Sequence, residues 1–319
     1  MKKIAILYGS PSSEREISNY TAQNISINLA SYKPVMVEWT LDNHFIVKDI
    51  NGKSLLPKPL SLKELIYLAQ KKNVFFVNAL HGEYGEDGYI QKIFEENKIS
   101  FSGPSAKAAE LSFDKYKTNE LLKTDLNIPC SLKFTKENFK PKEMKSVNFP
   151  IILKPNASGS SIGLMKIFDI AELNQAIENL QPKTDYLIQE CIDGREFSMG
   201  TVWNGEIFYN LAPTEIITRG KLFDYHQKYA KDGALEVTPA EISPEITRDI
   251  QEAAKTAHKK LNLGFYSRSD FILQNKSEKI YFLEVNSLPG FTNTSILPAE
   301  LKYAGMYEKF FDDLVSSTL

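Results

Sequence analysis

Cysteine is nearly absent from this 319-residue chain, which contains only Cys130 and Cys191. The two lie far apart without C-x-x-C spacing, which argues against a disulfide framework, a zinc ribbon or a dithiol redox motif and favours a reducing cytoplasm. Long apolar runs are also missing, so we expect a soluble protein without a membrane partner. The apolar run in the N-terminal "MKKIAILYGSPSSERE" stops after a few residues, which favours a first strand over a secretory signal.

A large excess of charge is absent as well. The chain has 38 basic and 40 acidic side chains and a net charge of -2, so bulk electrostatics give no reason to expect a nucleic-acid partner.

Two nucleotide-binding signatures are missing too. The G-K-S at 52–54 lacks the upstream glycine of a Walker A motif, and the chain has no G-x-G-x-x-G. Small, polar or phosphorylated ligands remain open.

What is present is an alternation of apolar runs and helical patterns. In the first hundred residues, KIAILYG, PVMVEWT and NVFFVNAL predict buried strands, and residues 17–30 and 62–69 have helical spacing. This alternation predicts a parallel sheet. The glycine and proline of ISFSGPS, residues 99–105, indicate a first domain boundary.

The rest of the chain predicts a small α+β unit and a longer C-terminal part. Residues 105–122 read as one helical stretch, and FPIILKP, GLMKIF and DYLIQECI as strands around the helix AELNQAIENL. Asn204 and Gly205 predict a hairpin turn. The polar region of roughly 212–242 is too long for an ordinary connector, so it is either a lid or disordered. A capped helix, SPEITRDIQEAAKTAHKKL, then precedes the strands FYSRSDFIL and KIYFLEVN.

Oxygen-bearing side chains end the last predicted strand, in FLEVNSLPGFTNTS at 282–295. Glu284 and Asn286 are two apart and therefore point to one face. Asp270, in SRSDF, lies on the preceding strand, and antiparallel pairing would bring the three together. Such a group suits one or two Mg²⁺ ions that bridge nucleotide phosphates. A solvated strand end with an Asx turn is the alternative.

Two basic residues accompany this group. Lys154 begins KPNASGSSIG, a small-residue loop after a strand, whose N–H groups could surround phosphate oxygens. A plain hairpin connection is an equally good interpretation of this loop. Arg268 lies two residues before Asp270 on the same face, where it either forms an ion pair or stabilises a developing oxyanion.

Two further candidates stand at carboxyl ends of the first predicted sheet, where α/β sheets bind ligands. His81 opens HGEYGEDGYIQ, whose glycines permit a sharp turn; a structural histidine is the alternative. Glu14 follows the first strand in GSPSSEREIS, although the helix dipole alone favours an acid in a first helical turn.

Together these segments resemble the D-alanine:D-alanine ligases of the ATP-grasp superfamily. EREIS, HGEYGEDGYIQ, SFDKYKT, KPNASGSSIG, GREF, FDYHQKYA, RSDF and EVNSLPGFTNTSILP occur in the family's order with compatible spacing, over nearly the whole chain. The resemblance implies an α/β, three-domain ATP-grasp architecture. Its parts would be an N-terminal parallel-sheet substrate domain (1–103), a central ATP-grasp domain (104–188) and a C-terminal ATP-grasp and catalytic domain (189–319), with a lid over roughly 212–242.

The resemblance also implies site residues. ATP would be held by Lys115, Lys154, Gln189, Glu190, Glu196 and Lys228. Two Mg²⁺ or Mn²⁺ ions would be held by Asp270, Glu284 and Asn286. The catalytic residues would be Glu14, Ser160, Tyr229, Arg268 and Gly290, and the substrate-binding residues His81, Ser295 and Ile296.

Several of these residues have more specific implied roles. Glu14 would hold the amino group of the first D-alanine, and it would close the lid together with Ser160 and Tyr229. Arg268 and the Gly290 N–H would form an oxyanion hole, while Ser295 would hold the second carboxylate. One departure from the family pattern is visible in LIQECIDGREF, where Gln189 occupies the position of the family's adenine-contacting glutamate and Glu190 follows it.

The implied reaction is ATP-dependent ligation of two D-alanine molecules through a D-alanyl phosphate, for peptidoglycan precursor synthesis. The enzyme would be a cytoplasmic homodimer. The neutral phenol of Tyr229 in HQKYA favours an amine as second substrate over the hydroxyl of D-lactate. The alternatives are another ATP-grasp carboxylate–amine ligase with a different amino acid, or a degenerate ATP-binding regulatory module.

Overall fold

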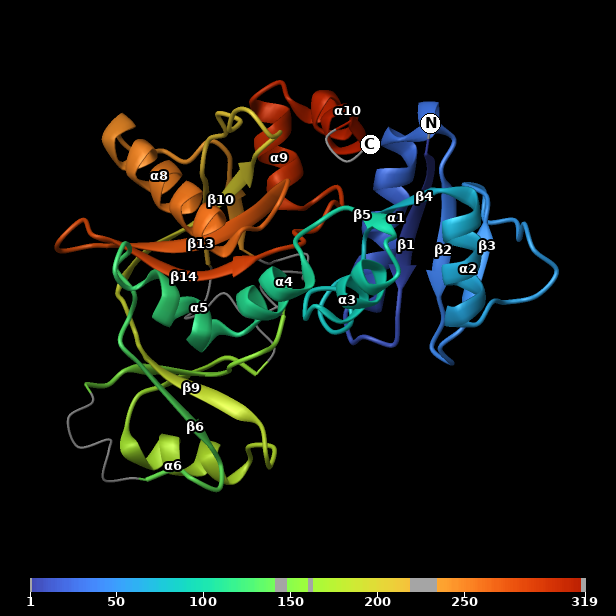
Figure 1. The fold of residues 1–319 in the computed structure, drawn as a ribbon. Helices are drawn as coiled ribbons and strands as arrows, with labels where there is room; N and C mark the ends of the chain where they lie inside the picture. The colour runs from blue at the N-terminus through green and yellow to red at the C-terminus, as the bar shows by residue number, and fades with distance from the viewer. Residues whose placement is uncertain (1, 141–147, 160–162, 219–233, 317–319) are drawn as a thin grey trace.

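The computed structural model describes residues 2–140, 148–159, 163–218 and 234–316, and these residues form three sheets (Figure 1). The elements of the first unit are β1 (Lys3–Gly9), α1 (Arg15–Asn28), η1 (Ala30–Tyr32), β2 (Val35–Trp39), β3 (Phe45–Lys48), α2 (Leu62–Lys72), β4 (Val74–Asn78), α3 (Tyr89–Glu96) and β5 (Ser100–Phe101). The strand order is β3-β2-β1-β4-β5, parallel except for β3. The predicted parallel sheet is confirmed.

Alternation of side chains along β1 builds a core on each face of this sheet. Ile4 and Ile6 pack with the buried side of α1, whereas Ala5 and Leu7 pack with α2 and α3. Because both faces are covered, the strands read as continuous apolar runs. The helices begin and end within a few residues of the predicted spans.

The second unit is a four-stranded antiparallel sheet with the order β6-β9-β7-β8. Its elements are β6 (Ser131–Thr135), β7 (Ile151–Pro155), β8 (Met165–Ile167), α6 (Ile170–Glu178) and β9 (Asp185–Glu190). One face packs against α6 in a core of its own, which includes Leu153, Leu173 and Ile188. The opposite face carries Lys154 and Gln189.

The third unit is a five-stranded sheet with the order β12-β11-β10-β13-β14. Its elements are β10 (Gly194–Val202), β11 (Thr214–Ile217), β12 (Leu235–Val237), α8 (Pro244–Leu261), β13 (Tyr266–Gln274), β14 (Ile280–Asn286), α9 (Ile296–Tyr303) and α10 (Tyr307–Ser316). Ser243 caps α8, as predicted, by accepting a hydrogen bond from the Ile246 N–H. The predicted hairpin follows β10, where Trp203 bridges to Phe208.

The stretch predicted as one helix before the second sheet is two helices, α4 (Ala106–Phe113) and α5 (Lys115–Leu122). Asp114 separates them because its backbone is extended, with φ -85° and ψ 98°, and its side chain accepts from the Lys117 N–H to begin α5. A residue that caps a new helix cannot also continue the previous one. Figure 1 shows both helices beside β14, and Leu122 joins the core of the third sheet.

A bulge in β14 divides that strand between core and pocket. Asp270 pairs with Glu284, but the next residue, Phe271, pairs with Phe282, so Leu283 is an additional residue on β14. Phe271 and Phe282 are therefore buried together, while Glu284 lies beside Asp270 on the other face. Such a bulge changes which side chains a strand presents to each face.

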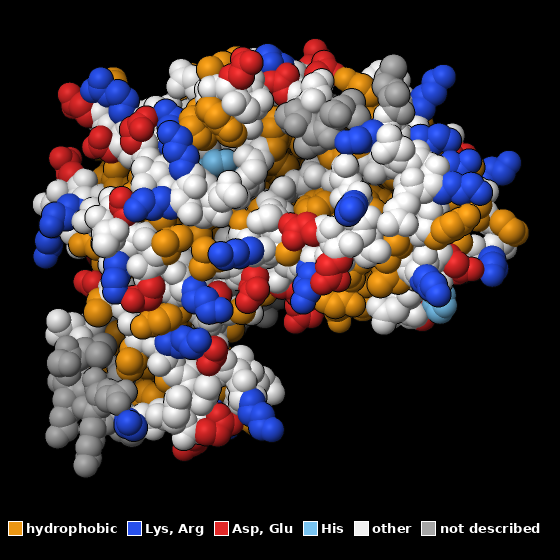
Figure 2. All heavy atoms as spheres, viewed as in Figure 1, with side chains coloured by type: hydrophobic (Ala, Val, Ile, Leu, Met, Phe, Trp, Pro, Cys, Tyr) orange, Lys and Arg blue, Asp and Glu red, His pale blue; other side chains and the backbone are white. Residues whose placement is uncertain are grey.

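The C-terminal helices return to the first unit. Figure 1 shows α10 close to the N-terminus, and Tyr32 Oη donates to Asp312 Oδ1 at 2.8 Å. On the face drawn in Figure 2, acidic and basic side chains are interspersed, and the second unit extends from the rest of the molecule. Within the described ranges, no helix combines the length and apolar character needed to cross a membrane.

Candidate active site

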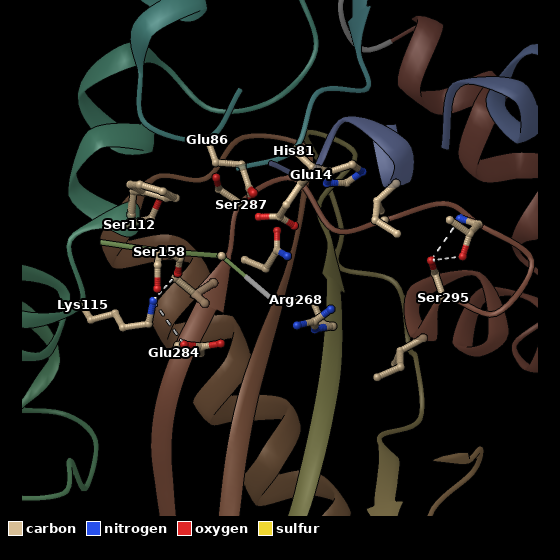
Figure 3. Close-up of a pocket in the computed structure, with 18 of the residues that line it drawn as sticks. Glu14, His81, Glu86, Ser112, Lys115, Ser158, Arg268, Glu284, Ser287 and Ser295 are labelled. Atoms are coloured by element: carbon tan, nitrogen blue, oxygen red, sulfur yellow. Dashed lines mark hydrogen bonds and ion pairs between the residues drawn. The ribbon is translucent and has the colours of Figure 1, made fainter. Parts of the chain in front are cut away.

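Those predicted site residues that the structure describes lie around two adjoining pockets. The first is lined by Glu14, His81, Lys115, Arg268, Glu284, Asn286, Gly290, Ser295 and Ile296. The second lies between the second and third sheets and is lined by Lys154, Gln189, Glu190, Glu196, Asp270 and Glu284. Glu284 and Ile216 line both. Figure 3 shows Glu14, His81 and Glu86 on one side of the first pocket, and Lys115, Glu284 and Arg268 on the opposite side.

Glu14 reaches the first pocket because it follows the carboxyl end of β1. It stands at the N-terminus of α1 but its side chain does not cap that helix. The carboxylate instead lies against two glycines: a Cβ on Gly82 or Gly159 would be 2.7 or 2.0 Å from its Oε1. Only glycine at both positions allows this approach, and Gly82 also has a φ of +65°. Helix-dipole stabilisation alone does not explain a carboxylate placed in this way.

Glu86 is a pocket residue that sequence reasoning missed. It is 6% exposed, and its Oε2 accepts from the Gly82 N–H at 2.7 Å. Burial, with the nearby charge of Glu14, raises the pKa of Glu86 to about 8. The available signal was an acidic residue in the glycine-rich loop after β4. The pocket therefore places a neutral acid beside Glu14 at pH 7.

His81, after β4, is also buried and neutral. Burial and the positive charge of Arg268 lower its pKa to about 4, against a hydrogen bond with the Leu288 backbone that raises it. Its Nε2 is 3.0 Å from Thr21 Oγ1. This histidine therefore acts in the site as a neutral hydrogen-bonding group.

The pocket face of the third sheet brings together the predicted cation and oxygen ligands. Asp270 pairs with Glu284 and Arg268 with Asn286 across β13 and β14, so all four share one face. Arg268 donates from Nε and Nη2 to the two Asp270 oxygens, at 3.0 and 2.9 Å. Burial lowers the pKa of Arg268, but the nearby charge of Asp270 outweighs burial, so the net effect is a raised pKa of Arg268. The predicted convergence is confirmed, and so is the ion pair.

These carboxylates have the chemistry that a magnesium ion requires. Their partners are cationic: Arg268 faces Asp270, and Lys115 Nζ lies 3.5 Å from Glu284 Oε2. The Asn286 Oδ1 accepts from the Leu288 N–H at 3.0 Å. Hard oxygen donors on one face fit Mg²⁺. In the described part of the chain no group of three or more His, Cys, Asp or Glu is arranged to hold a metal.

Two lysines flank the pockets. Lys115 Nζ donates to the Ser158 carbonyl at 2.7 Å, at the loop that follows β7. Lys154 is the last residue but one of β7, on its pocket face, and is 6% exposed. Burial lowers the pKa of Lys154 to about 8, and the Lys115 charge acts in the same direction, against Glu284. A buried cation whose charge is disfavoured by burial favours an incoming anion.

Gln189 and Glu190 lie at the end of β9 on the second pocket. Gln189 is 2% exposed, and its Nε2 donates to Ser131 Oγ at 3.0 Å. Glu190 is exposed, and its backbone N–H donates to the Cys130 carbonyl at 2.8 Å. Glu196 faces the pocket from β10, opposite Ile216 and Ile272.

The turn after β14 carries the remaining described candidates. A Cβ on Gly290 would be 3.0 Å from Ser295 Oγ and 3.9 Å from His81 Cε1, so this backbone lies between two pocket side chains. Ser295 Oγ accepts from the Thr292 N–H at 3.0 Å. Ile296 begins α9 and is buried.

Some candidates lie outside the described residues, and some pocket residues were not predicted. Ser160, Lys228 and Tyr229 belong to the first group, as do residues 219–233 of the proposed lid, whose described parts include β11 and β12. Pocket residues that were not predicted include Glu86, Ser112, Ser158, Ser287 and Thr292.

Three units with these topologies and a pocket that reaches between the second and third sheets define an enzyme of the ATP-grasp type. Family descriptions match almost the whole chain: "D-ala D-ala ligase N-terminus" over residues 3–104 and "D-ala D-ala ligase C-terminus" over residues 123–318. The chain therefore belongs to the D-alanine--D-alanine ligase family.

Individual relatives agree. A D-alanine--D-alanine ligase from Halalkalibacterium halodurans is 33% identical over 99% of both chains. The VanG D-Ala:D-Ser ligase of Enterococcus faecalis aligns with a TM-score of 0.83 and 26% identity, over 100% of this chain and 99% of that one. The Bacillus anthracis D-alanine--D-alanine ligase complexed with ATP aligns with a TM-score of 0.79 and 25% identity, over 100% and 97%.

Proposed function

We propose that this enzyme ligates two D-alanine molecules with ATP to give D-alanyl-D-alanine, ADP and phosphate. The observation that carries the proposal is the meeting of two pockets at Glu284. One pocket offers lysines and a deep cleft between sheets for a nucleotide. The other offers Glu14, Arg268 and Ser295 for two zwitterions. A phosphoryl group held near Glu284 is therefore adjacent to the carboxylate that it must reach.

The nucleotide is bound by the second and third sheets. Lys115 and Lys154 contact its phosphates, and Glu196 contacts the ribose. Gln189 and Glu190 face the base, where the amide of Gln189 supplies a carbonyl acceptor in place of a carboxylate. Mg²⁺ or Mn²⁺, two ions held by Asp270, Glu284 and Asn286, would neutralise charge on the transferring phosphoryl oxygens.

The first D-alanine is held by Glu14, whose charge binds the ammonium while the neutral Glu86 and His81 supply hydrogen bonds. Its carboxylate attacks the terminal phosphorus of ATP, the bond from that phosphorus to the bridging oxygen breaks, ADP leaves and an acyl phosphate is formed. The amine of the second D-alanine, held through its carboxylate by Ser295 at Ile296, then attacks the acyl carbon, and phosphate leaves.

Arg268 and the Gly290 N–H stabilise the oxygen that becomes negative in that second step. The described hydrogen bonds of Arg268 use Nε and Nη2, so Nη1 can donate to this oxygen. Ser160, Lys228 and Tyr229 complete the proposal as lid residues that exclude water from the acyl phosphate.

The wider biological proposal follows from the product. D-alanyl-D-alanine serves peptidoglycan precursor synthesis, and we place the enzyme in the cytoplasm as a homodimer, with neither nucleic acid nor membrane as partner. Its domains would span residues 1–103, 104–188 and 189–319.

Phosphate release tests the reaction. Purified protein with ATP and Mg²⁺ is incubated with a panel of D- and L-amino acids, and ADP and phosphate are measured. We expect strong stimulation by D-alanine and none by L-alanine. Equal stimulation by both enantiomers would remove the D-alanine assignment, and no stimulation by any amino acid would favour an ATP-binding regulatory module.

The second substrate needs its own test, because one structural relative is named as a D-Ala:D-Ser ligase. D-alanine, D-serine and D-lactate compete as second substrates at neutral pH, and the products are separated by mass. We expect the D-alanine dipeptide to predominate. Predominant ester would refute the amine assignment, whereas a shift toward ester in Tyr229→His would support the argument from the neutral phenol.

A further inference from the structure

Helix α1 of the first unit contacts the backbone of the turn that carries Gly290 and Ser295. Thr21 Oγ1 accepts from the Phe291 N–H at 3.3 Å, and Asn24 Nδ2 donates to the Phe291 carbonyl at 2.6 Å. Thr21 and Asn24 are three residues apart and so project from one side of the helix. One residue of the turn is thus held at both its N–H and its C=O by a different unit of the protein.

The side chain of Phe291 is anchored separately, in the core of the third unit. It is 1% exposed, and its ring stacks on Phe310 at a centroid distance of 4.8 Å and meets Phe311 at 5.6 Å. Phe291 therefore connects the first and third units, because its ring packs in the core of the third unit and its backbone is hydrogen-bonded to α1 of the first.

The two backbone contacts act on consecutive peptide planes. The Phe291 N–H lies in the rigid plane that also contains the Gly290 carbonyl, so the Thr21 bond holds the peptide plane that directly follows the Gly290 N–H in the chain. The Phe291 carbonyl shares a plane with the Thr292 N–H, and that N–H donates to Ser295 Oγ at 3.0 Å. Asn24 is thus connected through a single peptide plane to the hydroxyl of Ser295.

We propose that Thr21 and Asn24 are positioning residues, through which α1 sets the Gly290 backbone and the Ser295 hydroxyl, respectively. The inference rests on the proposed function, in which Gly290 stabilises the oxyanion and Ser295 holds the second D-alanine. It follows that the two residues affect different constants: Asn24 the KM for the second D-alanine, and Thr21 the turnover number.

Thr21 has an additional contact that fits this arrangement. Its hydroxyl oxygen accepts from the Phe291 N–H and also lies 3.0 Å from His81 Nε2. The Thr21 hydroxyl thereby connects the turn to His81.

The chain offers a matched control for Asn24. Asn28 lies one helical turn later, and its Nδ2 donates to the Tyr307 hydroxyl at 3.3 Å, as Asn24 Nδ2 does at 3.0 Å. Of these two asparagines, only Asn24 forms a hydrogen bond with Phe291. Asn24→Ala and Asn28→Ala therefore make the same substitution on the same helix and both lose a contact to α10, but only the first releases the turn.

The experiment compares steady-state constants of the full-length enzyme. We expect Asn24→Ala to raise the KM for the second D-alanine by about fivefold to tenfold, the equivalent of one hydrogen bond, with the KM for ATP unchanged. Asn28→Ala should leave both constants close to the unmodified values. Equal constants for the two variants would overturn the assignment of Asn24.

A second pair tests Thr21. Thr21→Val removes the hydroxyl and keeps the shape, and we expect it to lower kcat by at least about fivefold. Thr21→Ser keeps the hydroxyl and should restore kcat, which a purely structural role of the methyl group would not allow. Equal loss in both variants would overturn the assignment, and if Thr21→Val does not fold, the Asn24 pair decides alone. An unmodified enzyme that makes no dipeptide would instead refute the proposed function.

Discussion

The buried Glu86 gives the most direct test of the electrostatics of the first pocket. The change is Glu86→Gln, which keeps the shape of the side chain and an oxygen that can accept from the Gly82 N–H. It removes a group whose pKa rises from an ordinary 4.5 to about 8 because of burial and the charge of Glu14. Glutamine is neutral at every pH, as the native acid is in the folded state below about pH 8.

The magnitude follows from proton linkage. Below pH 4.5 the acid is neutral whether the chain is folded or unfolded, so it costs nothing. Above 4.5 the unfolded chain ionises but the folded one does not, and stability falls as the pH rises toward 8. The loss is about 2 to 3 kcal/mol between pH 5 and pH 7, and about 5 kcal/mol in total above pH 8.

The assay is urea unfolding of the first unit, followed by tryptophan fluorescence at several pH values. Trp39 reports this unit because its ring lies 5.4 Å from that of Tyr84. Trp203 belongs to the third unit, so both proteins carry Trp203→Phe. The measured quantity is the difference in the free energy of unfolding between Glu86→Gln and the parent.

We expect this difference to increase in favour of glutamine by about 2 to 3 kcal/mol from pH 5 to pH 7. Glu83→Gln is the control, because Glu83 lies in the same loop but is exposed, and its difference should stay constant. A Glu86→Gln difference that does not change with pH would show that Glu86 ionises normally in the folded protein, which would refute the reasoning.

Three further predictions concern the proposed reaction. Glu284→Gln should lower activity about a hundredfold or more with folding preserved, since it deletes charge at the proposed metal site; an active variant would return Glu284 to a plain strand end. The pKa of Lys154 is lowered to about 8, so ATP binding at pH 8 should be accompanied by the uptake of about half a proton. Calorimetry in buffers of different ionisation enthalpy measures this uptake. The absence of uptake would contradict a contact between Lys154 and phosphate. Gly290→Ala should fold normally but raise the KM for the second D-alanine at least about tenfold, because its Cβ would be 3.0 Å from Ser295 Oγ; an unchanged KM would show that Ser295 does not hold the second substrate.

The sequence by itself determined much of the fold. Continuous apolar runs separated by helical patterns give the parallel sheet of the first unit, because the burial of both faces leaves no polar alternation. The cap and proline of α8 mark its start for local reasons that need no tertiary contact. The i and i+2 spacing places Arg268 with Asp270, and Glu284 with Asn286. The order of short motifs was enough to identify the family.

Only the tertiary structure decided how these local pieces meet. Alternation from Phe282 would place Glu284 on the core side of β14, and the bulge at Leu283, set by pairing with β13, turns it to the pocket. Glu86 is an ordinary acid in the sequence, and its pKa is raised because the fold buries it beside Glu14. The hydrogen bond between Thr21 of α1 and Phe291 joins residues that are 270 positions apart in the sequence. Such features depend on register and burial between distant segments, whereas sequence patterns report only the periodicity of each segment alone.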